Sequence, residues 1–297
     1  MNITKNAMIT ICGRPNVGKS TLTNTLVGEK VAIVTNKPQT TRTRISAVVN
    51  RGGTQFVFLD TPGFHRARNR LGEYMVNLVR ESVAGVDGAL LLVEPIPSVG
   101  KQEQALIARI RETGVPAVLA INKIDTVAKE ALLEVIAAYS AAYDFQAVVP
   151  ISARTGDGVE QLLGELERLA VPGPPLFPED MVTDQPEKQI CAEIIREKML
   201  LCLEREVPHG TAVEITRFSQ REDGILDLEA VIYCEKESHK GIIIGKHGAM
   251  LKKIGALARG DIEGFMGEKV FLQTWVKVKE NWRDSQAQLR NFGFTES

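Results

Sequence analysis

The stretch GRPNVGKST at 13–21 restricts the fold of this chain more than any other. It has the spacing G-x-x-x-x-G-K-S and lies between a predicted strand at 7–12 and a predicted helix at 20–27. Its glycines let the backbone curl until the N–H groups point inward and form an anion nest, and the helix adds its positive end. The alternative is an ordinary glycine turn before a helix that matches this spacing by chance. We predict a phosphate site, with Lys19 facing the phosphates and the Ser20 hydroxyl as a Mg²⁺ ligand.

The bulk composition is that of an ordinary soluble globular protein. The chain has 297 residues, 44% hydrophobic and 25% charged, which favours two domains over one. No apolar run approaches the roughly 18 residues that span a bilayer, and residues 1–6 lack the apolar stretch of a signal peptide. The cysteines, at 12, 191, 202 and 234, form no C-x-x-C pair, which fits free thiols in a reducing cytosol. We expect a cytoplasmic protein without a disulfide or zinc framework.

From residue 7 to about 170, apolar runs alternate with helical patterns. Strands are expected at 7–12, 44–50, 54–60, 86–93, 115–121 and 145–151. Helices are expected near 20–27, 69–84, 101–113, 127–142 and 158–169. The alternation predicts an α/β fold, a doubly wound and mostly parallel sheet with helices on both faces. Ligands of such sheets bind at the carboxyl ends of the strands, so the loops that follow the strands are the candidate sites.

Two of these loops carry candidate groups for Mg²⁺ and a γ phosphate. The polar loop after the first helix has adjacent threonines, and we favour Thr41 over Thr40 to close over the metal and the phosphate. Taken alone, this stretch is better explained as an ordinary solvated loop. The third strand ends in D-T-P-G and delivers Asp60 to the sheet edge, where it can hold Mg²⁺ through water. Gly63 can offer its N–H to the γ phosphate because no side chain blocks the approach.

Two later loops can recognise a purine base. The motif N-K-I-D follows the fifth strand, and its Asp125 can accept two hydrogen bonds from the paired donors of guanine. Adenine lacks that donor pair and would leave the carboxylate unpaired, which discriminates strongly. Lys123 can pack along the base, and Asn122 can tie this loop to the phosphate loop. One strand later, S-A-R offers the N–H of Ala153 to the guanine carbonyl. An ATP site is the weaker alternative.

In this order, GRPNVGKST, TTR, DTPG, NKID and SAR resemble the five nucleotide motifs of translation-factor-class GTPases, over essentially all of 7–170. The resemblance implies GTP hydrolysis with Mg²⁺, and GTP or GDP as the ligand. It assigns catalysis to Asn16, Lys19, Thr41 and Gly63, and the metal to Ser20, Thr41 and Asp60. The implied nucleotide-binding residues are Gly13, Arg14, Pro15, Asn16, Val17, Gly18, Lys19, Ser20, Thr21, Asp60, Thr61, Pro62, Gly63, Phe64, Asn122, Lys123, Ile124, Asp125, Ser152, Ala153 and Arg154.

Two positions separate this chain from the small signalling GTPases. Phe64 follows D-T-P-G, where those proteins carry a glutamine that orients the attacking water, and a phenylalanine cannot hydrogen-bond water. The chain therefore resembles the subgroup with a hydrophobic residue at this position. In that subgroup an asparagine placed like Asn16 helps hold a K⁺ ion, which can stand in for an arginine finger. We hypothesise K⁺-stimulated hydrolysis; the alternative is that Asn16 only stiffens its loop.

The stretch 170–178 carries four prolines and a glycine, which neither a helix nor a central strand tolerates. It predicts a stiff, extended linker. All the nucleotide motifs lie before it. We therefore predict a GTPase domain at 1–170, a proline-rich linker at 171–179 and a smaller α+β domain at 180–297.

The second domain has the expected order helix, strand, strand, helix, strand. The elements are expected at 186–206, 211–219, 225–235, from 249, and at 270–278. An apolar run, the loop G-K-H-G and a basic helix follow one another at 241–253, which favours a type II KH domain over a simple turn. Such a loop clamps about four nucleotides of a single strand. The predicted RNA-binding residues are Ile244, Gly245, Lys246, His247, Gly248, Lys252 and Lys253.

The local charge and the tryptophans of the second domain are also relevant to the predicted RNA binding. The net charge of the chain is −1, yet 236–259 holds six lysines and arginines against Glu237 alone, which attracts a polyanion locally. Trp275 and Trp282 are candidates for stacking on bases, although the apolar strand around Trp275 favours a core position.

A GTPase domain joined to this type of KH domain resembles the bacterial Era family over nearly the whole chain. Further similarities are IIREK at 194–198 and WVKVK at 275–279. The resemblance implies binding near the 3′ end of small-subunit ribosomal RNA and a role in maturing the 30S subunit. It also implies a monomer in the cytoplasm with a loose, peripheral association with the cytoplasmic face of the membrane. Phe64 leaves an alternative, an RNA-binding assembly module in which GTP is a structural ligand with negligible turnover.

Overall fold

The computed structural model describes residues 2–63, 67, 69–83 and 85–294. The chain divides into two compact units. The first comprises Met1–Ala32, Thr41–Arg66 and Met75–Asp184, and the second comprises Ile33–Thr40, Ala67–Tyr74 and Gln185–Ser297. Two short segments of the N-terminal half therefore belong to the second unit, while the predicted domain limits at 170 and 180 stay predictions. No helix in the described ranges is long and apolar enough to cross a bilayer.

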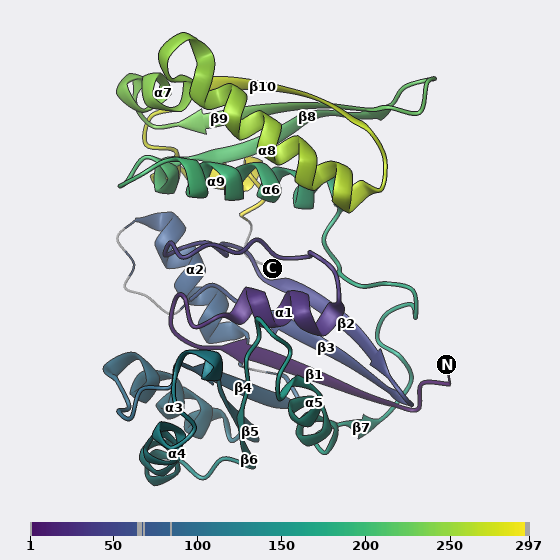
Figure 1. Cartoon of the computed structure of the whole chain (residues 1–297), viewed down its shortest axis with the longest axis vertical. Coiled ribbons are helices and arrows are strands. Elements are labelled where there is room, and N and C mark those ends of the chain that lie inside the picture. Colours follow the sequence, from purple (N-terminus) through teal and green to yellow (C-terminus); the bar gives the residue numbers. More distant parts are fainter. Residues whose placement is uncertain (1, 64–66, 68, 84, 295–297) are drawn as a thin grey trace. The chain divides into compact units, whose positions relative to one another are not determined.

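The first unit is built on one sheet with the strand order β2-β3-β1-β4-β5-β6 (Figure 1). β2 runs antiparallel to β3, the other neighbours are parallel, and the short β7 pairs antiparallel with β1. This confirms the predicted doubly wound, mostly parallel sheet. The strands are β1 Lys5–Cys12, β2 Ile45–Arg51, β3 Thr54–Asp60, β4 Gly88–Val93, β5 Ala117–Ile121, β6 Ala147–Pro150 and β7 Val171–Pro172. The helices are α1 Lys19–Val27, α3 Lys101–Thr113, α4 Ala131–Ala142 and α5 Val159–Glu167, with the 3₁₀ turn η1 at Ile124–Thr126. The helix α2, Arg70–Glu81, begins in the segment Ala67–Tyr74 of the second unit and continues into the first.

Apolar side chains cover both faces of this sheet. On one face, Ile9 of β1 belongs to a buried cluster with Leu22 of α1 and Leu162 of α5. On the other face, Leu91 of β4 lies in a cluster with Ile107 of α3. Because both faces are buried, the central strands are almost continuously apolar in sequence.

The parallel register brings the carboxyl ends of the strands to one edge. Ile11 pairs with Asp60, Val93 pairs with Ile121, and Ile121 pairs with Pro150. The loops that carry the predicted nucleotide motifs follow β1, β3, β5 and β6. They therefore meet at this edge of the sheet.

The proline-rich stretch after α5 is hydrogen-bonded to the first unit. Asn6 Nδ2 donates to the carbonyl oxygen of Pro174 at 2.8 Å. Gln55 Oε1 accepts from the backbone N–H groups of Leu176 and Phe177 at 2.7 and 2.9 Å. The stretch is therefore fixed to the strands of the first unit rather than only extended.

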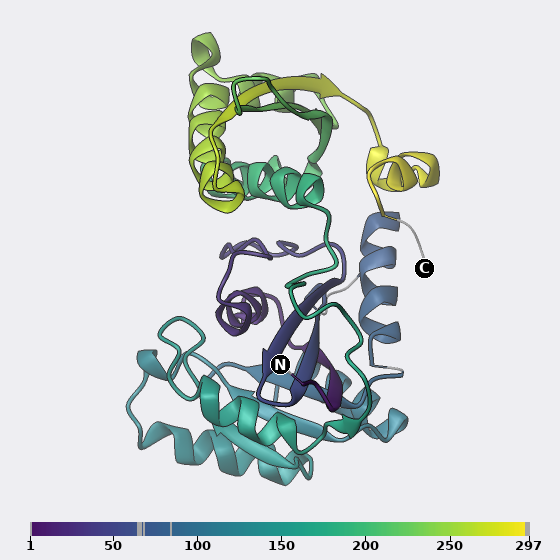
Figure 2. The same cartoon turned by 90° about the vertical axis from the view of Figure 1, so that its right-hand side faces the viewer.

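The second unit is a three-stranded sheet with the order β10-β9-β8, and helices pack on one of its faces (Figure 2). β9 and β10 are parallel, and β8 is antiparallel to β9. Its core contains Ile194 of α6, Leu228 and Ile232 of β9, and Ile254 and Ile262 of α8. The elements are α6 Glu187–Cys202, η2 Pro208–Gly210, β8 Ala212–Gln220, β9 Leu226–Cys234, α7 Glu237–Ile244, η3 Lys246–Gly248, α8 Ala249–Met266, β10 Val270–Val278, η4 Trp282–Asp284 and α9 Gln286–Asn291.

Two details of this unit differ from the sequence expectation. The apolar run before G-K-H-G is the helix α7, an additional element between β9 and α8. Trp275 is 54% exposed, so its predicted core position is wrong. Strand alternation turns Leu272 and Thr274 toward α8 and places Trp275 on the opposite face. Trp282 is the buried tryptophan, and its Nε1 donates to the carbonyl oxygen of Gly210 at 2.9 Å.

Candidate functional site

The loop between β1 and α1 has the backbone shape of a phosphate cradle. Gly18 has φ 102°, and a Cβ there would lie 2.3 Å from Nδ2 of Asn122, so the turn requires glycine. Lys19, the first residue of α1, is 6% exposed. Its Nζ donates to the carbonyl oxygens of Gly13 and Arg14 at 3.2 and 3.0 Å. A helix N-terminus and a buried ammonium thus lie on one short loop, an arrangement suited to phosphate.

The three predicted metal ligands lie together, although they come from α1, the loop before β2 and the end of β3. The Ser20 hydroxyl donates to Oδ2 of Asp60 at 2.8 Å and lies 2.9 Å from the Thr41 hydroxyl. The hydroxyl of Thr40 instead lies 2.7 Å from that of Thr35. Thr41 is therefore the threonine that lies beside Ser20, and its role as a metal ligand stays a prediction.

Asp60 has the chemistry of a metal ligand. It is completely buried, and its Oδ1 has no hydrogen-bond partner within the described ranges. Burial raises the pKa of the Asp60 carboxyl to about 6, against the opposing charge of Lys19. Burial also lowers the pKa of the Lys19 ammonium, which the charge of Asp60 opposes. A buried carboxylate oxygen without a partner is costly.

These oxygens fit Mg²⁺, which prefers oxygen ligands and binds through one or two carboxylates together with phosphate. Across the part of the chain that the structure describes, no three His, Cys, Asp or Glu residues cluster to hold a metal by themselves. One carboxylate with two hydroxyls suits an ion whose remaining ligands come from a bound nucleotide.

The predicted base-binding loops are tied to the phosphate loop. Asn122 Nδ2 donates to the carbonyl oxygen of Val17 at 2.7 Å, as expected from the sequence. Lys123 Nζ donates to the carbonyl oxygen of Asn16 at 2.7 Å. A purine placed over this loop would therefore contact a lysine whose position is already fixed.

Asp125 is prepared as a hydrogen-bond acceptor. Its Oδ1 accepts from the Ser152 hydroxyl at 2.7 Å, and its Oδ2 lies 2.5 Å from Nη2 of Arg154. The Ser152 hydrogen bond and the Arg154 charge hold the pKa of the Asp125 carboxyl below its ordinary value. The N–H of Ala153 donates to Oδ1 of Asn122 at 2.8 Å, so reading a guanine carbonyl would require it to share that bond.

The D-T-P-G loop lies against the phosphate loop. The Thr61 hydroxyl donates to the carbonyl oxygen of Ile11 at 3.0 Å. A Cβ on Gly63 would lie 2.9 Å from Cα of Pro15, so glycine permits this approach. Phe64 lies outside the described residues, and its role stays a prediction.

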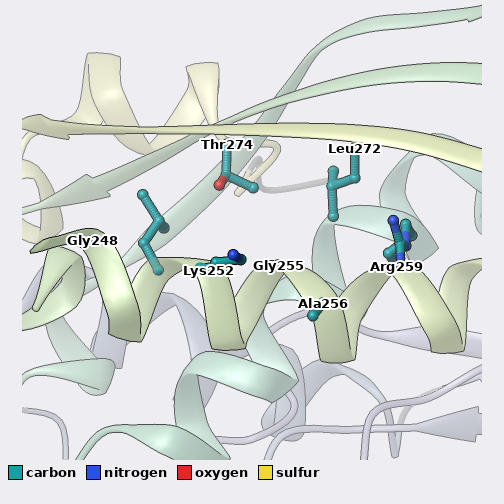
Figure 3. Close-up of a pocket in the computed structure, with 8 residues that line it drawn as sticks. Gly248, Lys252, Gly255, Ala256, Arg259, Leu272 and Thr274 are labelled. Carbon is teal, nitrogen blue, oxygen red and sulfur yellow. The ribbon is translucent and has the colours of Figure 1, made fainter.

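A second candidate site is a groove of about 440 Å³ between α8 and β10 (Figure 3). Of the predicted RNA-binding residues, Gly248 and Lys252 line it, while Lys246 and His247 are exposed in η3, directly before α8. The sequence prediction missed six further lining residues, Leu251, Gly255, Ala256, Arg259, Leu272 and Thr274. The four of these on α8 continue the helical spacing from Gly248 and Lys252, a signal that the sequence contains.

Two protein-family models match this chain. The first, a 50S ribosome-binding GTPase model, matches 8–123, and the second, a KH domain model, matches 206–283. The GTPase Era of Ruminiclostridium cellulolyticum is 50% identical over 290 residues, which cover 98% of this chain and 97% of the relative. The GTPase Era of Geobacter metallireducens is 50% identical over 293 residues, covering 98% of both chains. This chain belongs to the Era family of GTPases.

Solved Era structures have the same fold. An Era variant from Aquifex aeolicus, crystallised with GDP.AlF4-, has a TM-score of 0.94 and 35% identity, covering 98% of this chain and all of that chain. An Era in complex with MgGDPNP and nucleotides 1506–1542 of 16S ribosomal RNA also has a TM-score of 0.94 and 35% identity, covering 99% and 100%. The α/β GTPase fold followed by a KH domain is therefore that of the Era family.

Two carboxylates that the sequence prediction missed form ion pairs with the cations of the Era-type nucleotide loops. Glu94 lies between two cations, with Oε1 2.5 Å from Nζ of Lys123 and Oε2 2.9 Å from Nη2 of Arg14. The buried Glu103 lies 2.5 Å from Nε of the same arginine. The Arg14 side chain is thus held by carboxylates, so its contribution to phosphate binding would come from its backbone. Glu94 directly follows β4, so the rule that directed attention to the other strand ends would also have found it.

Proposed function

We propose that this chain binds and hydrolyses GTP with Mg²⁺, binds small-subunit ribosomal RNA near its 3′ end, and assists maturation of the 30S subunit. One observation carries the proposal: a nucleotide site with a Mg²⁺ donor set and a KH groove occur on one chain. The Era structure with MgGDPNP and 16S ribosomal RNA holds both ligand classes on the same fold. Cytoplasmic location, a monomeric state and contact with the membrane surface rest on the family resemblance alone.

Different residues of the first unit have different roles in the proposed GTP hydrolysis. The backbone N–H groups of the phosphate loop and Lys19 orient the phosphates and stabilise the charge that develops as the bond to the γ phosphate breaks. Ser20, Thr41 and Asp60 would hold Mg²⁺, which when bound neutralises charge on the β and γ oxygens. The Gly63 N–H is directed to the γ phosphate. Asp125 accepts from guanine and fixes the base.

K⁺ stimulation is part of the proposal, because Phe64 cannot orient the attacking water as a glutamine would. Asn16 has φ 66°, and its carbonyl group is held by Lys123, so the loop beside the phosphates is rigid. We expect single-turnover GTP hydrolysis to be at least about tenfold faster in KCl than in NaCl, because an ion there replaces an arginine finger. The comparison is made with and without ribosomal RNA. Equal rates in the two salts would refute the K⁺ role, and no hydrolysis in any condition would favour the structural-ligand alternative.

Introducing negative charge at η3 should weaken RNA binding if the KH loop contacts phosphates. In the full-length chain, changing Lys246 and His247 together to aspartate should weaken binding to single-stranded ribosomal RNA about 10- to 100-fold, because two donors become phosphate-repelling charges. Affinity for GTP should be unchanged. RNA affinity is measured by fluorescence anisotropy at several salt concentrations, with Lys188→Asp/Lys269→Asp, two exposed lysines outside the groove, as the matched control. Undiminished RNA binding by the first variant would refute the KH assignment.

A further inference from the structure

The segment that leads into Thr41 belongs to the second unit. Ile33–Thr40 is part of that unit, and the first unit resumes at Thr41. The peptide bond between Thr40 and Thr41 is therefore a point where the chain passes from one unit to the other. Whatever fixes the Thr40 carbonyl group also restricts where the Thr41 hydroxyl can lie.

A buried arginine of α6 holds this carbonyl group. Arg196 is 2% exposed, its Nη2 donates to the carbonyl oxygen of Thr40, and its Nη1 donates to that of Gln39 at 3.5 Å. Glu193, one turn earlier, accepts from Nε at 2.8 Å and from Nη2 at 2.5 Å. A buried guanidinium held by a carboxylate on one side presents its remaining donors in a fixed direction.

The segment itself is in a conformation that needs support. Gln39 has φ 59°, in the left-handed region that residues with a side chain rarely adopt. Further contacts with α6 and the residue after it hold the segment: the N–H of Val34 donates to Oε1 of the buried Glu197 at 2.9 Å, and Lys37 Nζ donates to the carbonyl oxygen of Leu203. The fixed segment ends next to Thr41, whose hydroxyl lies 2.9 Å from that of Ser20.

A second set of charges connects α6 to the helix that lines the groove. Oε2 of Glu197 accepts from Lys198 Nζ at 2.8 Å, and the same ammonium lies 2.5 Å from Oδ2 of Asp261 on α8. Glu197 and Lys198 are both buried. The segment before Thr41 and the groove helix are thus connected to α6 through the same carboxylate, because Glu197 accepts from Val34 with one oxygen and from Lys198 with the other.

We propose that Arg196 is a positioning residue for Thr41, so that a helix of the KH unit sets the preference of the nucleotide site for GTP over GDP. The inference rests on the proposed function of that site. Thr41 serves the γ phosphate and the Mg²⁺ of the triphosphate complex, whereas the diphosphate is held by the phosphate loop and Asp125. Loss of the Arg196 contacts therefore weakens GTP binding selectively.

The test compares GDPNP and GDP affinities of the full-length chain in Mg²⁺ by displacement of a fluorescent nucleotide. Arg196→Lys keeps the charge but loses the planar fork, and we expect GDPNP affinity to fall about tenfold with GDP affinity within twofold of the parent. The Mg²⁺ concentration that half-saturates the GDPNP complex should rise in parallel. Arg217→Lys changes an exposed arginine of the same unit and should alter neither affinity.

A double-mutant cycle separates positioning from general damage. If Arg196 acts through Thr41, then Arg196→Lys should cause no further loss of GDPNP affinity in a Thr41→Val background. Equal losses of GDPNP and GDP affinity, unchanged GDPNP affinity, or additive losses in the cycle would each overturn the inference and leave the proposed function intact. Failure of the parent chain to bind either nucleotide would instead overturn the proposed function and the inference with it.

Discussion

Replacing Lys19 with alanine should lower the affinity for GTP and GDP about 100- to 1,000-fold. The ammonium is buried and donates to two carbonyl groups of the loop that is expected to hold the phosphates. A 100- to 1,000-fold loss is about 3–4 kcal/mol, at the lower end of the roughly 3–5 kcal/mol that removing one partner of a buried charged contact costs. Because the charge of Lys19 holds down the pKa of Asp60, the variant should also raise that pKa above about 6 and weaken Mg²⁺ binding near neutral pH.

Isothermal titration with GDP and GDPNP measures the effect, and binding of single-stranded ribosomal RNA by the same protein is the internal control. RNA affinity in the absence of nucleotide should be unchanged, since the groove lies in the second unit. Lys101→Ala removes an exposed lysine at the start of another helix of the first unit and should leave all affinities unchanged. Nucleotide affinity within about threefold of the parent in Lys19→Ala would contradict the phosphate site.

The nucleotide site was predictable because its residues stand at strand ends. Asp60 and Asn122 each follow a buried apolar strand, and parallel register alone brings such positions to one edge. The contacts among Ser20, Thr41 and Asp60 then follow from motif order. The motif pattern favours Thr41 over Thr40, but the sequence does not reveal the left-handed backbone at Gln39 or the distant guanidinium of Arg196 that donates to the Thr40 carbonyl oxygen.

The sequence did not reveal the burial of one charged side chain or the exposure of one tryptophan, because both depend on tertiary packing. Arg196 stands on a helix in a run of charged residues, a pattern that usually marks a solvated face, yet it is buried against a segment about 157 residues earlier in the chain. The apolar strand favours a core position for Trp275, but α6 and α8 cover the face of the sheet opposite to the one on which Trp275 lies. Periodicity identifies the strand, whereas the choice of covered face is made by packing of α6 and α8.

Changing Asp125 to asparagine should convert the base preference from guanine to xanthine. The carboxylate offers two acceptor oxygens, fixed by Ser152 and Arg154, to the two adjacent N–H donors of guanine. Asparagine replaces one acceptor with an NH₂ group, which would face the 2-amino group of guanine as donor against donor. Xanthine carries an oxygen at that position and accepts the new donor. A site built around hydrogen bonds discriminates sharply when one partner is inverted.

We expect GTP affinity to fall about 100-fold and XTP to become the preferred triphosphate, because a mismatched polar pair is left unsatisfied. Competition among GTP, XTP and ATP for a fluorescent nucleotide measures the order of preference. Asp157→Asn changes an exposed aspartate of the same S-A-R loop region and should keep the parent order. If Asp125→Asn kept GTP first, the base would be recognised elsewhere. If ATP competed as well as GTP in the parent, the Ser152–Asp125 pair would serve only to hold the two loops together.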